Sequence, residues 1–416
     1  MRPRDVLCVP LGPGQPGAFL EALGARDDYE QFSIFCALML APHAVLAKPG
    51  VRVLSGFYGP VERKLRDLGA DVRFVPADFR RYAPAMRKLA ARVVATAAAP
   101  PDANGRMSLA LHAGASVDEL HRAGRDPERL LVVEVNPRLP RTFGIEPDHP
   151  HSLSVDEVDV IIESDAVLPT LPESSPTDVE NAIAEQIRPY VHDGATLQTG
   201  IGGIPCTVVE ILAGSGGGDY GIHSEMFTTG LMKLHKAGKI SNRKGIYDGV
   251  SIATFALGTD ELHTWLHEQS DVRFLPVHLV NDPAVIARNR RMLSINGALA
   301  VDLHGQLAAD TIDGRQFSGI GGAEDFVCGA SFSDGGHSIV CLPSTARVGG
   351  RTLSRIVAEF PAGALVTTPR HQVDVVVTEF GAAELAGLTV GERACALAEI
   401  AHPDFRDLLR DRARLR

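Results

Sequence analysis

Two glycine-rich segments in the second half of the chain have residue types suited to binding a negatively charged group. The first, LQTGIGGIP at 197–205, ends a predicted strand and starts a predicted helix, and the second, SGIGG at 318–322, precedes AEDFVCGA. Glycine lets backbone N–H groups approach a ligand, and a helix N-terminus adds partial positive charge. A phosphate, a pyrophosphate or a developing oxyanion would therefore fit, and the residues concerned are Gly200, Gly202, Gly203, Gly319, Gly321 and Gly322.

Neither glycine segment is a dinucleotide fingerprint, because the spacing is not GxGxxG. A structural turn is the commoner explanation of one such loop, with Pro205 well placed as the first helical residue. Two loops of this kind in one half of the chain favour a shared ligand over two unrelated turns.

Strand-like and helix-like segments alternate on both sides of these loops, which predicts parallel βαβ units with both sheet faces covered. Predicted helices lie at 16–25, 59–69 and 116–124. Predicted strands lie at 5–12, 51–57, 70–78, 92–98, 130–137 and 158–164, and then at 251–257, 272–280, 297–303, 337–343, 363–369 and 373–380.

A Pro-rich connector, LPTLPESSPTDVE at 168–180, divides the chain into two halves. After it, a helix leads into ATLQTGIGG and the alternation begins again. Since 416 residues exceed what one core usually organises, we predict two α/β domains at 1–190 and 191–416.

Composition narrows the classes of function. A formal charge of −10 argues against a general nucleic-acid surface, and no apolar stretch is long enough to span a membrane. Six cysteines without CxxC or Cys/His spacing indicate reduced thiols rather than a disulfide or zinc framework. We therefore expect a cytoplasmic protein without a metal site.

Several longer motifs resemble, in order and spacing, the acetyl-CoA hydrolase/transferase family, which includes 4-hydroxybutyrate and succinate:acetate CoA-transferases. In the second half they are GIHSEMFTTGLMKLHKAGKISN (221–242), VNDPAVIARN (280–289), SGIGGAEDF (318–326), LPSTA (342–346), VVTEFGAAEL (376–385) and IAHPDFRDLL (400–409). In the first half they are FYGP (57–60), PPDANG (100–105) and VNPRLPRTFG (135–144).

The resemblance implies two Rossmann-like α/β domains of related, NagB-like topology with the active site at their interface, and a homodimer. It also implies acyl-CoA and an acceptor as substrates, with no tightly bound cofactor. A glutamate carboxylate would attack the thioester and then carry CoA as a glutamyl thioester until an acceptor carboxylate takes it. The six glycines would form the CoA-binding and oxyanion loops.

The segment MLSINGALAVDLHGQ at 292–306 resembles a family segment that reads approximately INSALEVDLTGQ, whose Glu is taken as the nucleophile. Ala300 stands at that position and cannot form a glutamyl thioester. Three interpretations follow: an engineered inactive CoA-transferase, a natural variant acting as a non-covalent acyl-CoA hydrolase or acyltransferase, and a CoA-binding protein without turnover.

Other side chains near these motifs are candidates for the site. Glu324 could serve as a general base, although a surface Glu is the commoner explanation, and Cys328 has no evident His partner. His223 and Glu225 belong to the family pattern HSEM. Gln198 and Asn296 are further near-site candidates.

Overall fold

The first half of the chain forms a parallel seven-stranded sheet. The computed structural model describes residues 1–113, 116–200 and 202–415. The strand order is β4-β3-β2-β1-β5-β7-β9, and every neighbouring pair is parallel. The strands are β1 (Val6–Cys8), β2 (Phe32–Cys36), β3 (Val51–Ser55), β4 (Val72–Phe74), β5 (Val93–Ala98), β7 (Leu130–Val135) and β9 (Val160–Glu163).

Successive side chains along each strand point to opposite faces of this sheet and pack in two different hydrophobic cores. Leu7, Ile34 and Val53 pack on one face, whereas Cys8 and Phe35 pack on the other. Central strands such as β5 are buried at every position, which explains their continuous apolar sequences.

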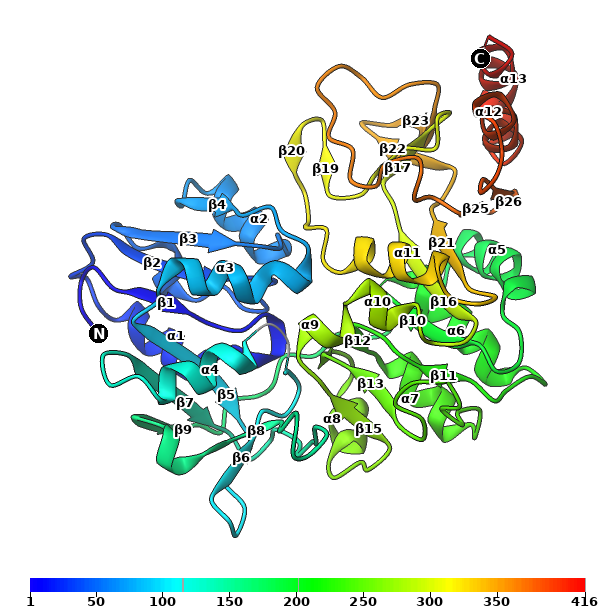
Figure 1. The fold of residues 1–416 in the computed structure, drawn as a ribbon. Helices are drawn as coiled ribbons and strands as arrows, with labels where there is room; N and C mark the ends of the chain where they lie inside the picture. Colours follow the sequence, from blue (N-terminus) through cyan, green and yellow to red (C-terminus); the bar gives the residue numbers. More distant parts are fainter. Residues whose placement is uncertain (114–115, 201, 416) are drawn as a thin grey trace.

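A second sheet follows with the order β11-β10-β16-β21-β25-β26, parallel except for the last pair. In Figure 1 it lies at the right, opposite the blue and cyan first sheet. Its strands are β10 (Thr196–Thr199), β11 (Gly221–Ile222), β16 (Met292–Gly297), β21 (His337–Cys341), β25 (Val375–Thr378) and β26 (Gly381–Glu384).

Helices connect and cover these strands (Figure 1). They are α1 (Gly17–Gly24), α2 (Pro60–Asp67), α3 (Tyr82–Leu89), α4 (Val117–Gly124), α5 (Asp178–Ile187), α6 (Gly203–Gly214), α7 (Thr229–Lys236), α8 (Asp260–Leu266), α9 (Val277–Val280), α10 (Pro283–Ile286), α11 (Ala323–Ser331), α12 (Val390–Glu399) and α13 (Pro403–Ala413). Thr177 and Glu180 form a capping box that starts α5.

Short strands build smaller sheets around the second sheet and in the connections. β17 (Ala300–Asp302) pairs with β18 (Leu307–Ala308) and β24 (Ile356–Val357). The other pairs are β6 (Arg106–Ser108) with β8 (Ser152–Ser154), β12 (Met226–Phe227) with β14 (Phe255–Ala256), β13 (Ser251–Ala253) with β15 (Val272–Phe274), β19 (Thr311–Ile312) with β20 (Arg315–Gln316), and β22 (Thr345–Val348) with β23 (Arg351–Ser354).

The predicted class, α/β with parallel sheets, is confirmed, and all six strands predicted in the first half are present. The predicted strand at 363–369 is wrong, because that segment is irregular apart from a single bridge between Leu307 and Thr368. The segment 272–280 is a strand only over Val272–Phe274 and then turns into α9. Strand β2 was missed, and so was β16, which the predicted strand at 297–303 meets only at Gly297.

Candidate functional site

The carboxyl ends of both sheets line one cavity. On the first-sheet side, Leu11, Ala37 and Phe57 follow β1, β2 and β3, each within three residues of the strand end. On the other side, Gln198 and Asn296 lie at the ends of β10 and β16. Ligands of open α/β sheets bind at the carboxyl ends of their strands, so this position marks the cavity as a candidate site.

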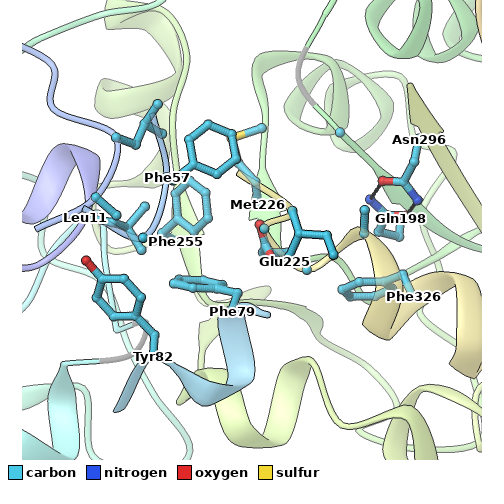
Figure 2. Close-up of a pocket in the computed structure, with 18 of the residues that line it drawn as sticks. Leu11, Phe57, Phe79, Tyr82, Gln198, Glu225, Met226, Phe255, Asn296 and Phe326 are labelled. Carbon is cyan, nitrogen blue, oxygen red and sulfur yellow. Dashed lines mark hydrogen bonds between the residues drawn. The ribbon is translucent and has the colours of Figure 1, made fainter. Parts of the chain in front are cut away.

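The cavity has a volume of about 130 Å³, and Figure 2 shows its residues as sticks. In that view Glu225 lies between the aromatic side chains of Phe57, Phe79 and Phe255 and the amides of Gln198 and Asn296. Among the described residues that line the cavity, Glu225 is the only carboxylate. This carboxylate is therefore the natural centre for chemistry in the cavity.

The backbone around Glu225 is held from two sides. Glu225 lies between β11 and β12, and its carbonyl accepts hydrogen bonds from the backbone N–H groups of Thr254 (2.9 Å) and Phe255 (3.3 Å). The preceding residue, Ser224, donates its N–H to Ile252 (3.0 Å) and its hydroxyl to the Met226 carbonyl (2.8 Å). The side chain is therefore presented from a rigid turn rather than from a free loop.

The Glu225 carboxylate has two hydrogen-bond donors, and the residue is only partly exposed. Asn281 donates its side-chain N–H to Oε2 at 2.7 Å, and the backbone N–H of Gly322 is a second donor. Burial nevertheless raises the pKa of Glu225 to about 7, against the effect of both donors. A carboxylate with a pKa near neutrality in a cavity is typical of a catalytic group.

A second buried acid lies behind Glu225 at the start of α11. Asp325 is 1% exposed, accepts a hydrogen bond from the same Asn281 amide at 3.3 Å, and lies 2.9 Å from the Arg80 Nε. Burial raises the pKa of Asp325, with Arg80 acting in the opposite direction and Glu225 adding to the rise. Asn281 thus hydrogen-bonds to two carboxyl groups, and the negative charge of Glu225 opposes the ionisation of Asp325.

Gln198 and Asn296 form the polar wall of the cavity. Their side-chain amides exchange two hydrogen bonds of 3.2 Å, and Asn296 also donates to the Ser294 hydroxyl at 2.7 Å. β10 and β16 are neighbours, while β11 lies on the other side of β10, so the pair sits where the strand order reverses. The two amides are suited to orient a carbonyl or carboxylate in the cavity.

The comparisons with known proteins point in one direction. The family model described as "Acetyl-CoA hydrolase/transferase C-terminal domain" matches residues 258–413. The chain is 39% identical over 416 residues to a succinyl-CoA:cyclohexane-1-carboxylate CoA transferase of Geobacter metallireducens, covering 99% of this chain and 92% of the relative. It is also 43% identical to a 4-hydroxybutyrate coenzyme A transferase of Clostridium kluyveri over 282 residues, which are 68% of this chain and 64% of that one.

The chain belongs to the acetyl-CoA hydrolase/transferase family. A crystal structure of RipA from Yersinia pestis superimposes with a TM-score of 0.89 at 33% identity, covering 99% of this chain and 94% of that one. The resemblance stated from the motifs is thereby confirmed, and the protein is an enzyme of this family.

In this family member, the predicted glycines separate into groups. Gly200, Gly321 and Gly322 line the cavity beside Glu225. Gly319 packs against the first-sheet side, where an added Cβ would lie 2.8 Å from the Gly56 carbonyl oxygen. The last two, Gly202 and Gly203, line a separate cavity with residues from 171–176 and from α6. Ile201 of the same loop lies outside the described residues.

Three other predicted residues do not line the cavity. Ala300 lies on β17, opposite Ala308 of β18. Glu324 accepts a hydrogen bond from the Thr368 hydroxyl, and burial raises the pKa of the Glu324 carboxyl. His223 is fully buried and hydrogen-bonds through Nε2 to the Val280 carbonyl at 2.8 Å, so it supports the turn that carries Glu225.

Sequence reasoning missed Asn281, Asp325 and Arg80 as partners of the site. The first two lie inside motifs that carried the family resemblance, VNDPAVIARN and SGIGGAEDF, which was the available signal. Within the described ranges, no cluster of three potential metal ligands is found. No helix there is long and apolar enough to cross a membrane.

Proposed function

We propose that the protein is an acyl-CoA:carboxylate CoA-transferase in which Glu225 is the nucleophile. The observation that carries the proposal is the position of Glu225: it is the cavity's one carboxylate among the described lining residues, under the Gly322 amide. This assignment replaces Ala300, the position expected from sequence. With Glu225 in the cavity, no missing nucleophile has to be explained.

The reaction would run in two half-reactions. Glu225 attacks the thioester carbonyl, the C–S bond breaks, and an acyl-glutamyl anhydride forms with release of the CoA thiolate. The thiolate then attacks the glutamyl carbonyl and expels the acyl group as a free carboxylate. An acceptor carboxylate reverses these steps and leaves with CoA, so the energy of the thioester is conserved without ATP.

Backbone amides and the amide pair have distinct roles in this scheme. The Gly322 N–H lies at the glutamyl carboxylate and can stabilise the oxyanion that develops there. Gln198 and Asn296 can orient the acyl carbonyl from the opposite wall.

The proposal also covers the division of the chain into domains and the position of the active site between them. We place the active site between two α/β domains, as the lining residues from both halves support. The boundary at 190 stays a prediction: Ile183 and Ile187 of α5 pack in one core with Leu197, but Ala97 and Leu139 of the first half belong to the same core. The homodimer and the cytoplasmic location stay predictions.

Mapping the covalent intermediate tests the nucleophile. Protein incubated with acetyl-CoA and no acceptor is analysed by intact mass and peptide mapping, alongside Glu225→Gln, Glu324→Gln and Ala300→Glu. We expect a CoA adduct on Glu225 in all but Glu225→Gln. An adduct that survives in Glu225→Gln, or one found only in Ala300→Glu and on residue 300, would refute the assignment. Steady hydrolysis of acetyl-CoA without acceptor would instead identify a hydrolase.

The rate of adduct formation should depend on pH through Glu225. Because its pKa is about 7 and only the ionised carboxylate attacks, we expect the rate to rise from pH 5.5 and level off above about pH 8. Asp325→Asn should leave the midpoint nearly unchanged, because the pKa of Asp325 is raised to about 8 and this acid stays largely protonated while Glu225 titrates. Rapid quenching followed by intact-mass measurement of the CoA adduct gives both profiles; a flat wild-type profile from pH 5.5 to 8 would contradict the expectation.

A further inference from the structure

The second glycine loop is held in place by the first half of the chain. The segment 316–322, called the 316–322 loop below, runs from the end of β20 to the start of α11 and ends at the amide that meets Glu225. Three of its backbone carbonyls accept hydrogen bonds from the first half: Gln316 from Arg66 at 2.6 Å, Phe317 from Arg63 at 2.7 Å, and Gly321 from the Phe79 N–H at 2.9 Å. The two arginines lie 250 and 254 positions before their partners in the chain, so only the fold brings them together.

Helix α2 presents both arginines from a rigid base. Arg63 and Arg66 are three residues apart, so they project from one face of the helix, and both are half-buried. The start of α2 is fixed by Glu62, which is fully buried and accepts a hydrogen bond from the Gly59 N–H at 2.9 Å. The Arg63 guanidinium also lies over the Phe317 ring, 4.4 Å from its centroid. In Figure 1, α2 lies at the edge of the first half that faces β19 and β20.

The middle of the 316–322 loop packs directly against the first half. A Cβ added at Gly319 would lie 2.8 Å from the Gly56 carbonyl oxygen and 2.9 Å from the Phe57 Cα, so the two backbones are in contact. The second half holds the start of the loop, where the N–H groups of Phe317 and Ser318 both donate to the Asp310 carbonyl. The part of the loop that reaches the site is therefore aligned against the first half.

We propose that Arg63 and Arg66 are positioning residues: by binding the carbonyls of the 316–322 loop, they fix it so that the Gly322 amide meets the Glu225 carboxylate. Neither arginine is among the described residues that line the cavity, so both act through the loop and not on the substrate. The inference rests on the proposed function, because it takes Glu225 as the nucleophile. It makes the reactivity of Glu225 depend on the contact between the two halves of the chain.

The rate and pH dependence of adduct formation test the positioning role. The double variant Arg63→Met with Arg66→Met removes both guanidinium groups and keeps their unbranched stems. With acetyl-CoA, rapid quenching and intact mass from pH 5.5 to 9.5, we expect the maximal rate to fall by about 10-fold or more. The midpoint should also move to higher pH, because the Gly322 N–H lowers the pKa of Glu225 and that donor would be displaced.

Two further variants control this experiment. Arg73→Met removes an arginine that pairs with Asp71 on the surface of the same half, and it should match the wild type in rate and midpoint. The double variant Arg63→Lys with Arg66→Lys should recover part of the rate, because an ammonium group can still donate to a carbonyl. A wild-type rate in the double Met variant, or a lower rate with an unchanged midpoint, would overturn the proposal.

Hydrogen exchange separates this inference from the proposed function. Amide exchange of the wild type and the variants is followed by mass spectrometry without any CoA compound. We expect faster exchange in peptides covering 316–326 in the double Met variant but not in Arg73→Met. If no adduct forms with any acyl-CoA, the proposed function fails, yet faster exchange confined to this loop still supports its positioning by α2. Unchanged exchange over 316–326 refutes the positioning whether or not an adduct forms.

Discussion

Replacing Glu225 by Gln is expected to lower kcat/KM by about three orders of magnitude or more and, at the same time, to stabilise the protein at alkaline pH. The amide keeps the shape of the side chain but is not a nucleophile, so the covalent route is lost. Steady-state assays with acetyl-CoA and several acceptors measure the kinetic part. A variant that retains a tenth of the wild-type kcat/KM would show that Glu225 is not the nucleophile.

The stability gain follows from the sign of the pKa shift. The pKa of Glu225 is about 7 in the folded protein against 4.5 ordinarily, so protonation favours folding. Stability is therefore lost as pH rises from about 4.5 to about 7, and the full cost, up to about 3 kcal/mol, is present above pH 7. Glu225→Gln removes this cost, so its advantage should be large at pH 8 and small at pH 5.

Urea unfolding at pH 5 and pH 8 measures that difference in the free energy of unfolding. Glu128→Gln, a change of the same type on the exposed surface, serves as the control and should be neutral at both pH values. A Glu225→Gln variant less stable than wild type at pH 8 would mean that the hydrogen bonds from Asn281 and Gly322 outweigh the burial of the charge.

The parallel architecture was predictable because the strands and the helices between them have distinct local sequence patterns. Strands such as β5 and β7 are buried on both faces and therefore read as continuous apolar runs between helical segments. The failures have local causes too. The segment 363–369 has β-branched residues but lies in a loop, since tertiary context decides whether such residues pair. The sequence FSIFC of β2 continues directly into further apolar residues, which hid the end of the strand.

The site was less predictable, because it depends on which strand ends face each other. Glu225 precedes Gly322 by almost a hundred residues, yet the two are hydrogen-bond partners. Motif resemblance drew attention to Ala300, whereas only the fold places Glu225 in the cavity with Gln198 and Asn296. A sequence rule that could have helped is that Glu225 lies three residues after the end of β11, at the sheet edge where ligands bind.

Gly322→Ala is expected to lower kcat/KM by about 100-fold or more although every polar side chain of the site is kept. A Cβ at Gly322 would lie 1.9 Å from Glu225 Oε2 and 2.0 Å from Asn281 Nδ2, so the carboxylate and its donor must both move. The backbone itself tolerates alanine, since the φ angle of Gly322 is −99°. The loss would therefore come from displacing Glu225 rather than from backbone strain.

The control is Gly216→Ala, where an added Cβ meets nothing within 4 Å. Both variants are compared by kcat/KM, by the yield of the CoA adduct and by urea unfolding. We expect Gly216→Ala to match wild type and Gly322→Ala to remain folded with little adduct. If Gly322→Ala forms the adduct at the wild-type rate, the Gly322 amide and the placement of Glu225 beneath it do not govern the chemistry, and the nucleophile must be sought outside the described lining of this cavity.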